Sequence, residues 1–91
     1  VYQELPRTLD EAVEHLDLVL DPSYKQVIAE TLKDDILDYH FGLGLMIRNA
    51  FKLHTENPHL LTSCGTADPG EASTVIIETL WTRLQGEALS L

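Results

Sequence analysis

Three of the four prolines in this chain directly follow an aspartate or an asparagine, and no other feature constrains the fold as strongly. The three pairs are Asp21-Pro22, Asn57-Pro58 and Asp68-Pro69. An Asp or Asn side chain accepts a hydrogen bond from a free N–H at the start of a helix. Proline suits the first helical position, because its missing N–H has no intrahelical partner there. The repeated pair therefore predicts three helix starts and an all-α chain.

A further helix start lies upstream of these pairs. Thr8 and Glu11 have the spacing of a capping box, in which each side chain accepts from the backbone N–H at the other's position. Apolar residues then recur at helical spacing, at Leu9, Ala12, Val13, Leu16, Val19 and Leu20. This pattern predicts a helix over 9–20. The helix that begins at Pro22 is expected to run to 31 and to bury Tyr24, Val27, Ile28 and either Thr31 or Leu32.

The two remaining Asx-Pro pairs predict the last two helices. A short helix over 58–64 is expected to end at Gly65, since glycine adopts the left-handed conformation of a helix C-terminus at little cost. The last helix is expected over 69–85, ended by Gly86, with Ile77 and Trp81 beside its apolar stripe. We expect that stripe to consist of Ala72, Val75, Ile76, Leu80 and Leu84.

The run from His40 to Phe51 is the most apolar part of the chain and holds Gly42 and Gly44. A GxG pattern can form a ligand loop, but a strand should then precede it. Helical spacing instead continues through both glycines, at Ile36, His40, Leu43, Ile47, Ala50 and Phe51. We therefore predict one helix over 33–52, buried on all sides, whose glycines let neighbouring helices approach. Two interior glycines cost such a helix about 2 kcal/mol relative to alanines. A kink or a ligand loop there remains as an alternative.

Together these patterns predict one compact all-α domain over residues 1–91. It should contain four main helices and one short helix, with 33–52 as the buried spine. Residues 1–7 form a lead-in and 87–91 a tail. A chain of 91 residues is of ordinary size for a single domain.

The charge of the chain limits its partners. The net charge is −9, and residues 1–38 hold ten of the fifteen carboxylates. Such a chain repels nucleic acid and anionic membranes and attracts basic proteins. Four acids follow one side of the first helix and its end, at Asp10, Glu14, Asp17 and Asp21. We expect these residues, together with Arg48, to bind a basic partner; the alternative is that the acids only aid solubility.

A second candidate site consists of His40, Arg48 and Asn49, near the two glycines. It requires the three side chains to converge on a cleft that binds a small ligand or performs catalysis. The competing interpretation makes His40 a neutral core residue and pairs Arg48 with a carboxylate of another helix.

The sequence offers little other chemistry. His54, Glu56 and His59 have no spacing typical of a closed zinc site, so we expect a solvated loop. Cys64 is expected to pack beside the helix end. We therefore predict no catalytic residue, no metal and no cofactor.

The chain resembles a small bacterial domain family of unknown function. The residues that carry the resemblance are His40-Phe41-Gly42-Leu43-Gly44, Ile47-Arg48-Asn49 and Phe51, with weaker matches over about 5–85. Lys52-Leu53-His54 stands where the family more usually has Gly-Leu-Trp, and Leu32 where a capping serine is common. The resemblance implies a fold but no reaction.

We expect a cytoplasmic protein, because no signal peptide or membrane span is evident and a single cysteine is typical of a reducing compartment. The leading functional hypothesis is a non-enzymatic interaction module that binds a basic macromolecule, as immunity and inhibitor proteins do. The alternatives are the ligand or catalytic site at His40, Arg48 and Asn49, and a structural homo-oligomer that uses Trp81.

Overall fold

The computed structural model describes residues 5–32, 34–36, 42–54 and 57–89, with side chains up to residue 86, and its regular elements are five α-helices. They are α1 (Leu9–Val19), α2 (Pro22–Glu30), α3 (Leu43–Ala50), α4 (Pro58–Ser63) and α5 (Pro69–Leu89). The all-α class is confirmed. All four predicted helix starts at caps are also confirmed. Thr8, Asp21 and Asn57 each accept from a backbone N–H, and α5 begins at Pro69.

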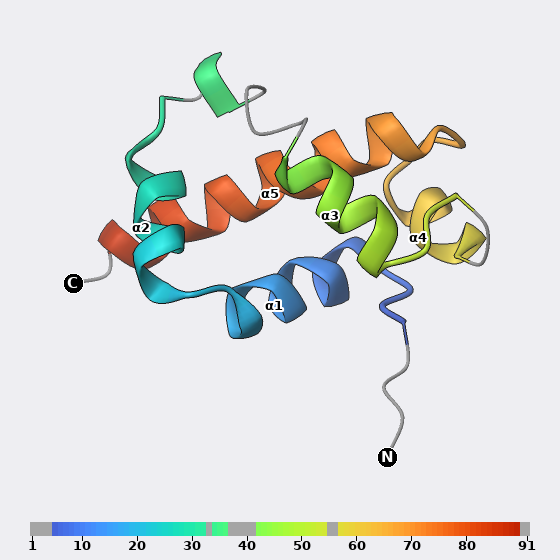
Figure 1. Ribbon diagram of the computed structural model, residues 1–91, viewed down its shortest axis with the longest axis horizontal. Coiled ribbons are helices and arrows are strands. Elements are labelled where there is room, and N and C mark those ends of the chain that lie inside the picture. Colours follow the sequence, from blue (N-terminus) through green and yellow to red (C-terminus); the bar gives the residue numbers. More distant parts are fainter. Residues whose placement is uncertain (1–4, 33, 37–41, 55–56, 90–91) are drawn as a thin grey trace.

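Helix α5 is the centre of the fold. It packs against α1, α2, α3 and α4, and it crosses the middle of the molecule between α4 at its start and α2 at its end (Figure 1). The buried residues of α5 are all apolar apart from Ser73. The described chain measures 36 × 32 × 20 Å along its principal axes. The predicted spine at 33–52 is therefore wrong, because the last helix has this role.

Residues 33–52 do not form one helix. A 3₁₀ turn covers 34–36, Gly42 lies in a turn, and α3 begins only at Leu43. Residues 37–41, including His40, lie outside the described residues. Leu45 and Met46 are 50% and 42% exposed, so α3 is not buried on all sides as predicted. A Cβ at Gly42 would meet nothing within 4 Å, so this glycine does not admit a neighbouring helix.

The core draws on every helix. Its buried apolar members are Ala12, Val13, Leu16, Ile28, Ile36, Leu43, Ile47, Phe51, Leu53, Leu60, Ala72, Ile76, Ile77, Leu80 and Leu84. Most were predicted from helical spacing, but Val19, Val27, Leu32 and Ala50 are exposed. On α5, Ile77 is buried and Val75 is half-buried, the reverse of the prediction. Among the described helices, none is both long and apolar enough to cross a membrane.

Helices α3 and α4 end in the same hydrogen-bond pattern. After α4, Gly65 has φ 78°, its N–H donates to Thr62, and the next N–H donates to Leu61. After α3, Lys52 has φ 54°, its N–H donates to Asn49, and the next N–H donates to Arg48. Both are Schellman motifs, which favour glycine at the left-handed position. The predicted role of Gly65 is confirmed, and Lys52 holds the same position despite its side chain.

Gly86 does not end the last helix as predicted, because α5 continues to Leu89. Two side chains of its last turns attach it to α2. The indole Nε1 of Trp81 donates to the carbonyl oxygen of Thr31 at 2.8 Å, and the amide of Gln85 donates to that of Ala29. These contacts fix α5 on both sides of Leu84, which is itself buried. They offset the roughly 1 kcal/mol by which an interior glycine weakens a helix.

Candidate functional site

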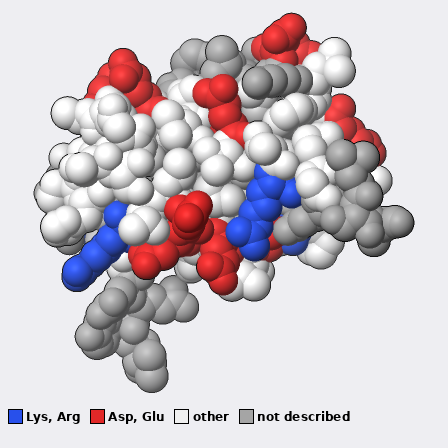
Figure 2. Space-filling view, turned by 180° about the vertical axis from the view of Figure 1, so that it is seen from behind, with Lys and Arg blue, Asp and Glu red and all other residues white. Residues whose placement is uncertain are grey.

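Three carboxylates lie exposed on the first half of α1, at Asp10, Glu11 and Glu14. We call these three residues the acidic face. Asp10 and Glu14 are one helical turn apart and form no ion pair within the described part of the chain. On the side of the molecule seen in Figure 2, red carboxylates gather in the lower half between two groups of blue cations. Because both residues are exposed, the acids predicted at Asp10 and Glu14 are accessible from solvent.

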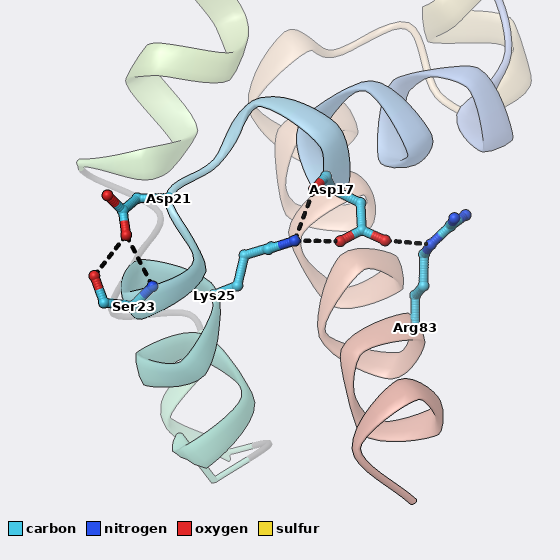
Figure 3. A network of polar contacts seen from close by, with 5 residues as sticks. All are labelled: Asp17, Asp21, Ser23, Lys25 and Arg83. Atoms are coloured by element: carbon cyan, nitrogen blue, oxygen red, sulfur yellow. Dashed lines mark hydrogen bonds and ion pairs between the residues drawn. The ribbon is translucent and has the colours of Figure 1, made fainter. Parts of the chain in front are cut away.

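Asp17, predicted to continue this series, is in a different environment. Its side chain is only 11% exposed, and its carboxylate lies between two cations from other helices (Figure 3). Lys25 Nζ of α2 is 3.0 Å from Oδ1, and Arg83 Nε of α5 is 2.9 Å from Oδ2. Lys25 Nζ also donates to the carbonyl oxygen of Asp17 at 2.8 Å. Asp17 therefore joins three helices, and the expectation of an open carboxylate there is wrong.

Asp21 is exposed, but its carboxylate caps α2. Its Oδ1 accepts from the Ser23 hydroxyl at 2.6 Å and from the Ser23 backbone N–H at 2.9 Å. These two hydrogen bonds, the hydroxyl first, lower the pKa of the Asp21 carboxyl below its ordinary value. The carboxylate therefore stays ionised to a lower pH, and its structural role is to cap the start of α2.

The second candidate site is only partly described. Arg48 is half-buried on α3, and its Nη1 donates to the Ser73 hydroxyl of α5 at 3.1 Å. Ser73 is fully buried and donates in turn to the carbonyl oxygen of Gly70. Asn49 is exposed, and His40 lies outside the described residues. Within the described chain, Arg48 pairs with a hydroxyl, and the carboxylate partner that we predicted is not found there.

An open depression of about 320 Å³ lies at the start of α1, where no sequence pattern predicted one. It is lined by Leu5, Pro6, Arg7, Glu11 and His15. His15 is half-buried and packs edge-to-face on Phe51, with ring centroids 5.7 Å apart and an interplanar angle of 67°. One member of the acidic face, Glu11, thus also forms part of a concave surface.

Asn57 holds the wall of this depression in place. Its side chain is buried, and its Nδ2 donates to the carbonyl oxygens of Pro6 at 2.8 Å and Phe51 at 3.0 Å. Its Oδ1 accepts from the backbone N–H of Leu60 as the cap of α4. The cap was predicted, but the two donated bonds were not. A signal was present, because Asn57 is the only asparagine among the three Asx-Pro caps, and only asparagine adds N–H donors to the accepting oxygen.

The remaining candidate groups are separate from this surface. His54 and His59 are exposed, and Glu56 lies outside the described residues. Cys64 is half-buried against the core, and burial raises the pKa of its thiol. Within the ranges described, no three His, Cys, Asp or Glu side chains are placed to share a metal ion.

Comparisons with known proteins identify a family but no activity. A model of the domain of unknown function DUF6794 matches residues 5–84. The match covers most of the chain, so the chain belongs to this family, and the predicted resemblance to a family of unknown function is confirmed. No curated protein and no solved structure matches.

Proposed function

We propose that this DUF6794 domain is a non-enzymatic interaction module that binds a basic macromolecular partner in the cytoplasm, as immunity and inhibitor proteins do. The observation that supports the proposal is the acidic face. Asp10 and Glu14 are exposed without an ion pair in the described chain, in a protein with a net charge of −9. Carboxylates in this state attract a cationic partner and accelerate its association.

The arrangement of cations supports placing the partner on the first half of α1. Lys25 and Arg83 neutralise Asp17 near the C-terminal end of that helix. The uncompensated charge of α1 is thereby concentrated toward its N-terminal end, where its own first turn adds Asp10 and Glu11. A partner attracted by charge should contact this end first.

The other two hypotheses have less support. Arg48 is bound to Ser73 in the contact between α3 and α5, so part of its donor capacity already serves the fold. The depression on α1 contains neither Arg48 nor Asn49. A homo-oligomer through Trp81 is also less favoured, because Trp81 is half-buried against the core and donates to the carbonyl oxygen of Thr31.

A charge-reversal experiment tests the proposal. The double variant Asp10→Lys/Glu14→Lys should lose most capture of a basic partner from a cell lysate, when compared quantitatively with the unmodified chain. Asp17 should be left intact, because reversing its charge would break the contact among α1, α2 and α5.

The matched control reverses two acids elsewhere. Asp34 and Asp35 are exposed in the 3₁₀ turn, away from the start of α1 (Figure 1). Asp34→Lys/Asp35→Lys makes the same change in net charge and should retain most of the capture. Equal loss in both variants would mean that only total charge matters. Unchanged capture by Asp10→Lys/Glu14→Lys would refute the proposal.

A further inference from the structure

We infer that the depression at the start of α1 receives an arginine side chain of the basic partner. The inference rests on the proposed function and specifies it, since it names the side chain that anchors the complex. Few residues carry most of the binding energy in protein interfaces, and arginine is one of the residue types enriched among them. The depression of about 320 Å³ lies at the lower end of ligand-site volumes, which range over about 300–1,000 Å³, so it suits one long side chain.

Glu11 supplies the carboxylate for such a guanidinium. Its Oε1 accepts from the backbone N–H of Arg7 at 2.9 Å, which holds the side chain over the depression. Its Oε2 has no hydrogen bond among the described residues, and the residue is exposed. A carboxylate fixed in this way forms charge-assisted bonds to a planar guanidinium, whose N–H groups are arranged as a fork.

The other lining residues suit the rest of an arginine side chain. The imidazole of His15 is held by its edge-to-face contact with buried Phe51, so it presents a fixed ring on which a guanidinium can stack. Leu5 and Pro6 are half-buried and apolar, and the carbonyl oxygen of Pro6 is held by Asn57. They can cover the methylene groups of the arginine stem. Lysine has a similar stem but lacks the planar group.

One residue of the lining opposes a cation. Arg7 is exposed at the depression and carries a positive charge. The three carboxylates of the acidic face outnumber it in the same part of α1. The local field therefore still favours a cation. The place of the partner's arginine beside Glu11 and His15 is set by the shape of the depression as well as by charge.

Two peptides test the inference, one of nine lysines and one of nine arginines, titrated calorimetrically into the full chain at one ionic strength. The arginine peptide should bind about tenfold more tightly, a difference of about 1.4 kcal/mol. Glu11→Gln should remove this preference while the amide oxygen can still accept from Arg7. Glu14→Gln, outside the depression, makes the same charge change and should weaken both peptides equally without altering the preference.

The outcomes separate this inference from the proposed function. If both peptides bind equally, or if Glu11→Gln keeps the preference for arginine, the anchor is overturned and the interaction module stands. If neither peptide binds, both fail. A second readout uses the unmodified chain, in case Glu11→Gln does not fold. The ring resonances of His15 should shift with the arginine peptide and not with the lysine peptide, and equal shifts would contradict the inference.

Discussion

The side-chain amide of Asn57 lies 2.8 Å from the carbonyl oxygen of Pro6, so a buried residue at the start of α4 holds the segment that precedes α1. The same Nδ2 donates to the carbonyl oxygen of Phe51, at the end of α3. The segment before α1, 51 positions away in the sequence, thus meets the end of α3 and the start of α4 at one amide. The position of Leu5 and Pro6, and with it the shape of the depression, depends on this residue.

Replacing Asn57 should therefore destabilise the fold substantially. Asn57→Ala removes the cap of α4 and leaves two carbonyl oxygens without their donor, which should cost about 2–4 kcal/mol in the free energy of unfolding. Asn57→Ser restores only the cap and should recover about 1 kcal/mol of that loss. Urea denaturation measures both values. A loss below about 1 kcal/mol for Asn57→Ala would show that the three hydrogen bonds contribute little.

The two Schellman motifs lead to a matched pair of predictions. Lys52→Gly relieves a side chain at φ 54° and should raise the free energy of unfolding by about 0.5–1 kcal/mol. Gly65→Ala introduces a side chain at φ 78° and should lower it by about 1 kcal/mol. Nothing lies within 4 Å of a Cβ at position 65, so the effect there isolates backbone conformation. Chemical denaturation of both variants would contradict the account if the two shifts had the same sign.

The resemblance implies a glycine where this chain has Lys52, and the backbone supplies a physical reason for that expectation. The left-handed residue after α3 favours glycine, and this chain places a lysine there.

Asp17 should matter for stability and not for partner binding. Asp17→Asn leaves Lys25 and Arg83 without their shared carboxylate and should cost about 1–2 kcal/mol. Arg83→Gln should cost less than about 1 kcal/mol, because Arg83 is 43% exposed and its charge is screened by solvent. Asp10→Asn is the control, since it neutralises an exposed acid without an ion pair in the described chain and should change stability by less than about 0.5 kcal/mol. Thermal or urea unfolding that ranks Asp10→Asn as the most destabilising would refute this assignment.

Asp21 should make the free energy of unfolding fall more steeply as the pH is lowered into the acid range. Its folded-state pKa is lowered by the hydroxyl and backbone N–H of Ser23, while the unfolded value is near 3.9. Its contribution is therefore complete above the unfolded pKa and is lost as the pH falls through the folded pKa. In the variant Asp21→Asn, the new amide would still cap the helix but would not titrate. We expect a shallower fall in stability below about pH 4, measured by urea unfolding across pH, and an unchanged slope would contradict the prediction.

Local signals predicted the helix starts correctly, because a cap depends on residues within one turn. Helical spacing, from which the helix over 33–52 was predicted, failed there because buried residues at that spacing also arise from separate elements that face one core. Ile36, Leu43 and Ile47 are all buried although a turn at Gly42 precedes α3. Helical spacing therefore identified the core side chains better than it identified the helix.

The candidate site was predicted only in part for a related reason. The accessibility of Asp10 and Glu14 follows from the polar side of one helix, which the sequence displays. The pairing of Asp17 with Arg83 joins residues 66 positions apart, and no local pattern indicates it. The depression likewise depends on where Asn57 fixes the lead-in.

The most direct test of the central claim is the association rate of a captured basic partner, measured at low and high salt. For the unmodified chain the rate should fall steeply as salt rises, because the acidic face steers the encounter. Asp10→Lys/Glu14→Lys should associate slowly at low salt and lose most of the salt dependence. Asp34→Lys/Asp35→Lys should keep most of the association rate at low salt and most of its salt dependence. The claim would be contradicted if Asp10→Lys/Glu14→Lys associated as fast as the unmodified chain with the same salt dependence.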